Sequence, residues 1–377
     1  MRTDLAQLAN IAFSADAVRV DKRVLADLVD ILAQEHDVVA PVARDGSIAL
    51  GKITRIDQLA KGYRDVQSPG HYRLEEAADA GVFSYANGME SPKKYLHPSR
   101  LTICAGQLHR GGFEFEEEPP PVRKLAFLGI RPCDCQSILV LDKTFLSQHV
   151  DEHYRSRREG SFVAVVNCTR PGDLCFCASM GSGPKADRGF DLALTELKDG
   201  FLVEPGSDTG WEVLRQLTTR KASQDERLAA ASAIADTAAH MGRTLDTSAL
   251  PQLLRGGLDH PHWDLMKSWC IGCANCTMVC PTCFCYSIAD QIDFKQRRLS
   301  RERVWDSCFT WQFTEVHGCN FRDTLRSRYR HWACHKLGYW VEQYGVFGCV
   351  GCGRCITWCP VGIDITAVAT SVRRERQ

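Results

Sequence analysis

The chain has 377 residues, of which 44% are hydrophobic and 24% charged, a composition typical of soluble globular domains. Its 46 basic and 46 acidic residues give a formal net charge of zero, so there is no electrostatic reason to expect nucleic acid or an anionic membrane as the main partner. Because no apolar run approaches the ~18–20 residues of a membrane span and the N-terminus lacks a secretory signal pattern, we expect a cytoplasmic protein without membrane insertion.

Residues 1–210 are predicted to form a mixed α/β domain. Apolar side chains recur at helical spacing over 24–34, with Asp21 as the expected N-cap. Short apolar segments between turn-forming residues predict strands at 37–42, 47–53, 124–130 and 161–167. The last two segments are nearly all apolar, which is typical of strands buried on both faces.

Five cysteines of this domain directly follow the last two segments, in GIRPCDC (129–135) and NCTRPGDLCFC (167–177). Ligand sites in open α/β sheets gather at the carboxyl ends of the strands, so we expect these thiols to converge. Four thiols would suffice for an iron–sulfur cluster. The alternative is a set of buried structural cysteines in tight turns, and the spacing leaves open which thiol would be the spare. The five residues are Cys133, Cys135, Cys168, Cys175 and Cys177.

The segment SMGSGPKA (179–186) superficially matches a dinucleotide-binding fingerprint. It neither follows a strand directly nor opens a clean helix, and Pro184 interrupts the pattern. Nucleotide binding is therefore the weaker interpretation of this segment.

Residues 211–256 are predicted to form a packed helical connector. Ser223 and Glu226 have the spacing of a capping box at the start of a helix, and Gly242 is a plausible stop. Beyond this connector the composition changes, because 13 of the 19 cysteines and seven of the eight tryptophans lie at Trp263 or later. This change predicts a domain boundary near residue 256.

Residues 257–377 are predicted to form a helical, ferredoxin-like domain with a long insertion at 286–348. Two runs, 270–281 and 349–360, share the spacing C-x2-C-x2-C-x3-C-P. This is the bacterial ferredoxin signature of [4Fe–4S] clusters, in which the fourth cysteine usually binds the other cluster. The first cluster is predicted at Cys270, Cys273, Cys276 and Cys359, and the second at Cys280, Cys349, Cys352 and Cys355.

Two other interpretations fit the cysteines less well. Structural zinc typically uses two separate C-x2–4-C pairs, which fits the runs less well. A disulfide framework belongs to small secreted domains, whereas this chain is large and has an odd number of cysteines, 19. Gly272, Gly351 and Gly353 are expected to let the backbone approach the cluster sulfides.

Several features of the C-terminal region lie outside the two runs. The insertion is expected to contain helical stretches, and the tail 363–374 is expected to be an amphipathic helix with Asp364 as its N-cap. Surplus cysteines are expected to be buried small hydrophobes, although a surplus thiol beside a cluster could be a ligand in an altered site. These residues are Cys283, Cys285, Cys308, Cys319 and Cys334.

The motifs GIRPCD, CFCASMGSGP, CIGCANCTMVCPTCFC, WDSCFTWQFT and CVGCGRCITWCPVGIDI occur in this order. As an ordered set they resemble the iron–sulfur β subunit of cytoplasmic NiFe hydrogenases of the sulfhydrogenase type. The A subunit of anaerobic sulfite reductase is similar to the same pattern. The resemblance covers approximately residues 124–368. It implies an electron-transfer subunit that works with a flavin- and NAD(P)-binding subunit, a small iron–sulfur subunit and a NiFe catalytic subunit.

We therefore expect an α+β, non-catalytic electron-transfer subunit of an oxidoreductase complex. It would relay single electrons through two [4Fe–4S] clusters, or three if the N-terminal thiols hold another. One alternative is the same relay in an anaerobic sulfite reductase. Alternatives of other classes are a metal-stapled binding module without redox activity and an enzyme with catalysis at the N-terminal cysteines.

Overall fold

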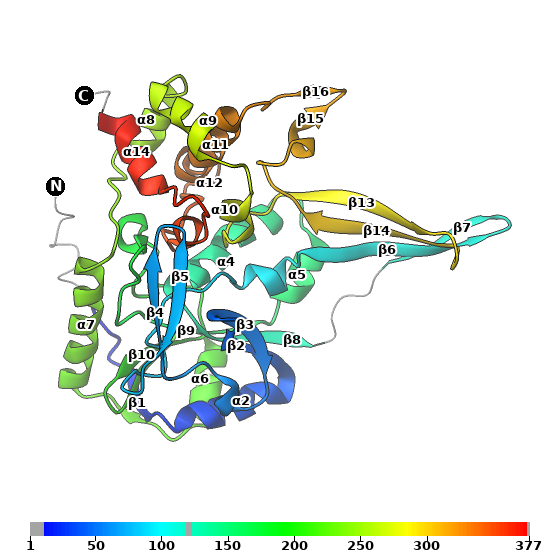
Figure 1. Cartoon of the computed structure of the whole chain (residues 1–377). Helices are drawn as coiled ribbons and strands as arrows, with labels where there is room; N and C mark the ends of the chain where they lie inside the picture. The colour runs from blue at the N-terminus through cyan, green and yellow to red at the C-terminus, as the bar shows by residue number, and fades with distance from the viewer. Residues whose placement is uncertain (1–10, 118–122, 375–377) are drawn as a thin grey trace.

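The computed structural model describes residues 11–117 and 123–374, and its centre is an eight-stranded mixed sheet (Figure 1). In spatial order the strands are β12 (Arg220–Lys221), β1 (Val18–Asp21), β11 (Gly200–Pro205), β10 (Leu192–Leu197), β9 (Phe162–Val166), β8 (Lys124–Ile130), β2 (His36–Arg44) and β3 (Ser47–Ile53). Strands β10, β9, β8 and β2 are mutually parallel, and antiparallel strands complete both edges. The predicted mixed α/β character of this region is confirmed.

The central strands are buried on both faces, as their apolar sequences predict. In β9, Phe162 faces one hydrophobic core and Val163 faces the other. Helix α2 (Val24–Glu35) packs in the first core and helix α4 (Pro132–Phe145) in the second. The shorter helices of this half are η1 (Ile56–Gln58), α3 (Lys93–Leu96), α5 (Glu152–Arg158), η2 (Cys177–Met180) and α6 (Asp208–Leu214).

The predicted N-cap of α2 is wrong. Asp21 belongs to β1, where it pairs with Gly200. The helix begins three residues later at Val24, and its N-cap residue, Arg23, makes no side-chain cap hydrogen bond. Because the strand continues through Asp21, its carboxylate is not at the helix terminus.

Residues 211–256 are mainly helical, with α7 (Gln224–Ala239) and α8 (Leu250–Gly256). The capping box of α7 is present: Glu226 N donates to Ser223 Oγ at 3.2 Å, and Ser223 N donates to Glu226 Oε2 at 2.9 Å. Strand β12 also lies in this segment and pairs with β1, so the connector contributes an edge to the main sheet.

A second sheet extends from the body as an arm (Figure 1). Its order is β13 (Tyr286–Asp293), β14 (Arg298–Trp305), β6 (Arg100–His109) and β7 (Gly112–Glu117). The expectation of helical stretches is wrong for this part of the insertion, where pairing of β14 with the distant β6 decides the conformation. No local sequence pattern could predict this pairing, because β6 lies in the N-terminal half of the chain.

The rest of the C-terminal region consists of short helices around a separate core that includes Trp263, Trp332 and Ile356. The helices are η3 (Pro261–Leu265), α9 (Met266–Trp269), α10 (Asn275–Met278), η4 (Gln312–Thr314), α11 (Leu325–Cys334), η5 (His335–Tyr339), α12 (Trp340–Tyr344), α13 (Arg354–Thr357) and α14 (Ile365–Arg374). A two-stranded ribbon, β15 (Glu315–Val316) and β16 (Cys319–Asn320), lies in the insertion. As predicted, Asp364 caps α14, since its Oδ1 accepts from Thr366 N at 2.8 Å.

A hairpin of the N-terminal half reaches the second cysteine run. It is formed by β4 (Tyr63–Ser68) and β5 (His71–Glu76), which Figure 1 shows side by side, and its strand β4 contacts α13. At its tip Gly70 N donates to Ile356 O at 3.1 Å, and Tyr72 stacks on Trp358 with ring centroids 5.2 Å apart. The two halves are thus packed together. In the described ranges, no helix has both the length and the apolar character needed to cross a membrane.

Candidate metal centres

All 19 cysteines are free thiols, and they are unevenly grouped. Among residues 11–117 and 123–374, no three or more His, Cys, Asp or Glu side chains are arranged to hold a single metal ion. The thiols instead form wider sets.

The first set combines three thiols of the first run with one thiol of the second. Its members line one cavity together with aromatic side chains, and they are Cys270, Cys273, Cys276 and Cys359. Burial raises the pKa of the Cys276 thiol well above its usual value, and the charges of the other three thiols raise it further. Residue Cys359 therefore faces the loop at 270–276, although 83 positions separate it from Cys276.

The second set combines three thiols of the second run with one thiol of the first run, Cys280. Burial raises the pKa of Cys355 well above its usual value, and Cys349, Cys352 and Cys280 add to the shift. The pKa of Cys349 is raised to about 12 by burial, with Cys280 and Cys352 contributing in the same direction. The structure therefore brings together the four members of each predicted set, including the crossing residue.

A third set lies where β8 and β9 end. Burial raises the pKa of Cys177 well above its usual value, followed by the charges of Cys175, Cys168 and Cys352. The pKa of Cys133 is raised mainly by burial, then by Asp134 and Cys177. Because β8 and β9 are parallel, their carboxyl ends meet, and the segments that follow them carry these thiols to one place.

The fifth thiol of this region, Cys135, points elsewhere. It follows Cys133 by two residues in α4, and two residues of an α-helix are rotated by about 200°. Its Sγ lies 3.4 Å from Arg188 O and 3.3 Å from Gly189 O, and the residue packs in the core beneath the sheet. Cys135 therefore lies apart from the other four thiols of this region.

Buried cationic and polar groups surround the third set. Arg354 pairs with Asp134 at 2.8 Å, and both side chains are almost fully buried. Asn87 Nδ2 lies 3.0 Å from the Cys133 Sγ. Arg131 donates to the carbonyl oxygens of Phe83 and Tyr85 and to the Cys168 thiol. Such groups can offset the negative charge of bound thiolates. No spacing pattern in the sequence could identify them.

Glycines allow the second run to touch the third set. Phe176 N donates to Gly351 O at 2.8 Å, and a Cβ on Gly351 would lie 2.7 Å from the Phe176 backbone. A Cβ on Gly353 would lie 2.6 Å from Leu174 O. Both glycines have positive φ, 63° and 77°. The backbone of 174–177 is the close contact that requires glycine at these two positions, and the approach of the backbone to cluster sulfides stays a prediction.

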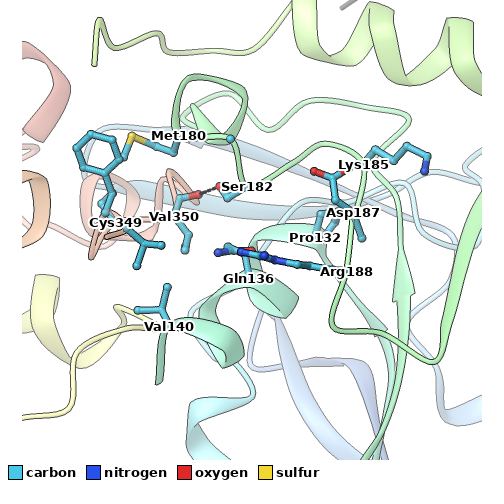
Figure 2. Close-up of a pocket in the computed structure, with 14 residues that line it drawn as sticks. Pro132, Gln136, Val140, Met180, Ser182, Lys185, Asp187, Arg188, Cys349 and Val350 are labelled. Atoms are coloured by element: carbon cyan, nitrogen blue, oxygen red, sulfur yellow. Dashed lines mark hydrogen bonds between the residues drawn. The ribbon is translucent and has the colours of Figure 1, made fainter. Parts of the chain in front are cut away.

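A cavity of about 400 Å³ opens between the second run and the N-terminal half (Figure 2). Cys349 and Val350 lie on one side, and Lys185 and Arg188 lie on the other. Ser182 Oγ donates to Val350 O at 2.6 Å. The segment 179–186 continues into a loop rather than a helix, so it lacks the helix N-terminus that a dinucleotide fingerprint requires. Among the members of the second set, Cys349 lines this cavity.

The donor chemistry of all three sets fits one kind of group. Sets of four neighbouring thiols match the ligation of [4Fe–4S] clusters by four cysteines, and those of the first set line a cavity. Such a cluster supplies one-electron redox chemistry when bound.

Comparison with known proteins agrees with this chemistry. Residues 269–363 match the family described as 4Fe-4S dicluster domain. The chain is 32% identical to sulfhydrogenase 2 subunit beta of Pyrococcus furiosus over 334 residues. These aligned residues make up 85% of this chain and 94% of that relative. No solved structure is significantly similar. The chain therefore belongs to the family of sulfhydrogenase β subunits, as an iron–sulfur electron-transfer protein with a 4Fe–4S dicluster domain.

Proposed function

We propose that this chain relays single electrons through three [4Fe–4S] clusters inside a multi-subunit hydrogenase complex. The observation that carries the proposal is the interlocking of the two runs, in which Cys359 joins the first set and Cys280 joins the second. Cross-ligation of this kind places two clusters side by side in ferredoxins.

Three groups of ligands follow from the thiol sets. We assign cluster 1 to Cys270, Cys273, Cys276 and Cys359, cluster 2 to Cys280, Cys349, Cys352 and Cys355, and cluster 3 to Cys133, Cys168, Cys175 and Cys177. Cys135 is excluded because its thiol faces the carbonyls of Arg188 and Gly189.

The geometry supports a linear order of the three sites. Cys352 of the second set contributes to the raised pKa of Cys177, after burial and two nearer thiols, and its O lies 3.7 Å from Cys175 Sγ. At the other end, Cys355 of the second set also lines the cavity of the first set. The second set therefore lies between the other two, and electrons would pass through it.

The site of cluster 1, at the end of this row away from cluster 3, borders solvent. Cys273 is exposed, and the neighbouring side chains of Ile271 and Trp269 are 61% and 48% exposed. Exposed apolar side chains beside a redox site are typical of docking surfaces. We infer that a partner subunit covers cluster 1.

The relative's name, subunit beta, supports assembly with other chains. We propose a flavin- and NAD(P)-binding subunit, a small iron–sulfur subunit and a NiFe catalytic subunit as the partners. In this assembly the chain would carry electrons between the flavin subunit and the catalytic subunit and would have no catalytic residue of its own.

Iron and sulfide analysis of the anaerobically purified full chain tests the cluster assignment. We expect about twelve irons per chain, against about eight if the third set holds nothing. Cys168→Ala should lose about four irons, whereas the matched variant Cys135→Ala should keep all of them. Electron paramagnetic resonance of the reduced chain should show interacting cluster signals. Stoichiometric zinc without iron would overturn the relay.

A further inference from the structure

Three cysteines that belong to none of the three thiol sets lie near the start of β13 and the end of β14: Cys283, Cys285 and Cys308. Cys283 and Cys285 follow the first run in PTCFC, and Cys308 follows β14. The β13–β14 hairpin brings the last two together, because its register pairs Tyr286 with Trp305. Asp306 N donates to Cys285 O at 2.9 Å, which closes the base of the hairpin.

The thiols of Cys285 and Cys308 touch each other, unlike the members of the first set. They share a side-chain hydrogen bond, and a backbone group of Cys308 also contacts Cys285. The members of the first set instead line a cavity. Thiols in direct contact suit formation of an S–S bond, whereas ligands of a [4Fe–4S] cluster must stand apart to enclose it.

The two thiols differ in exposure. Cys308 is buried, with 4% of its surface exposed, and it lies near Cys276 of the first set. Cys285 is only half-buried. Cys308 is therefore the inner member of the pair, near the first set, and Cys285 is the outer member.

Two buried ammonium groups lie beside these thiols. Lys336 and Lys93 are only 2% and 3% exposed, and among the described residues neither forms a salt bridge with a carboxylate. Lys336 Nζ donates to Thr282 Oγ1 at 2.9 Å, and Lys93 Nζ lies 3.9 Å from the centroid of the Trp305 ring. Lys93 Nζ also donates to Met278 O at 3.1 Å, and burial lowers the pKa of Lys93 to about 8, so Lys336 is the stronger cation beside the thiols.

The local electrostatics favour a thiolate at the outer position. The pKa of Cys285 is lowered by the hydrogen bond with Cys308, and Lys336 lowers it further against the effect of burial. A thiolate stabilised by a cation is the reactive form in thiol–disulfide chemistry.

We propose that Cys285 and Cys308 are a redox-active dithiol–disulfide pair that is reduced by the clusters of the relay. The inference rests on the proposed function. The disulfide takes up two electrons and two protons: its Sγ–Sγ bond breaks, and two thiols form. The electrons arrive singly, one from each of two reduced clusters, and the protons come from solvent at Cys285. The reverse step returns two electrons to the clusters. The pair thus converts two one-electron transfers into one two-electron change.

Thiol labelling of the full, cluster-loaded chain tests this inference. Samples are poised anaerobically at a series of potentials, denatured in the presence of N-ethylmaleimide and analysed by peptide mass spectrometry. We expect Cys285 and Cys308 to be labelled at low potential and linked, without label, at high potential. The transition should have a two-electron slope. Cys285→Ser should leave Cys308 labelled at every potential, and Cys308→Ser should do the same for Cys285.

Cys334→Ser is the matched control, since Cys334 is buried in α11 outside every thiol group described above. It should leave the labelling of the pair unchanged. Wild-type iron content and resonance signals in Cys285→Ser and Cys308→Ser, together with their loss of linkage, would support the pair. If either variant loses about four irons, the residue is a cluster ligand and the inference is overturned. Labelling of both thiols at every potential would also overturn it, while the relay would stand as long as the cluster signals persist.

Discussion

The two cysteine runs have the same spacing but different surroundings. The second run, 349–360, is covered by the N-terminal half: the β4–β5 hairpin contacts it from one side, and the backbone of 174–177 contacts Gly351 and Gly353 from another. The first run, 270–281, borders solvent through exposed Cys273. The same spacing of cysteines therefore occurs in two different settings: the second run is packed against the N-terminal half, and the first run borders solvent.

The largest effect is expected where the runs exchange a ligand. Cys359→Ala removes a second-run thiol, yet it should abolish the cluster of the first run and about four irons per chain. Iron analysis and electron paramagnetic resonance measure this loss. Cys135→Ala, outside all three sets, is the control. Retention of the first-run signals in Cys359→Ala would show that the runs do not interlock.

A second large effect is expected at the buried ion pair that joins the second run to α4. Arg354→Met leaves the buried Asp134 carboxylate without its partner and should lower the free energy of unfolding by about 3–5 kcal/mol. The matched variant Arg301→Met breaks an exposed pair with Asp290 in the arm and should cost about 0–1 kcal/mol. Thermal unfolding of both variants measures the difference. Equal losses would mean that the second run is not anchored through this pair.

The glycines give a smaller but direct comparison of the runs. Gly351→Ala and Gly272→Ala both place a side chain at positive φ, which costs about 1–2 kcal/mol. At Gly351 the added Cβ also meets the Phe176 backbone, which should add about 1–3 kcal/mol. At Gly272 it meets only the Leu325 side chain, which can move. Denaturant unfolding should therefore rank Gly351→Ala as the less stable variant, and the opposite rank would contradict the backbone contact.

The smallest effect on stability is expected at the open rim of the first run. Trp269→Ala combined with Ile271→Ser should change the free energy of unfolding by about 0.5 kcal/mol, because both side chains are exposed. Electron transfer in the purified complex should fall about tenfold, the equivalent of about 1.4 kcal/mol of lost docking free energy. Ile292→Ser, at an exposed site on the arm, is the control. An unchanged rate in the double variant would place the partner elsewhere.

Spacing and strand patterns predicted much of the site, but only its local part. The spacing of the two runs predicted two groups of four thiols. The apolar segments 124–130 and 161–167 predicted that the thiols of GIRPCDC and NCTRPGDLCFC would gather at one edge of the sheet. The exclusion of Cys135 required knowing that α4 begins at Pro132, because only then do Cys133 and Cys135 point apart.

Other features depend on contacts between distant segments. The strand β14 pairs with β6, and Arg354 reaches Asp134 across 220 positions. The buried ammonium groups of Lys93 and Lys336 meet the thiols in the same way. Neither propensity nor periodicity records such contacts, because each segment is locally compatible with other conformations.

The sheet that β14 shares with β6 has a consequence for the independence of the C-terminal half. A fragment starting near residue 257 would expose an unpaired strand edge on β14 and would leave Gly351 and Gly353 facing water instead of a backbone. The portion that carries the two cysteine runs therefore depends on the N-terminal half for its strand pairing and for the packing of its glycines.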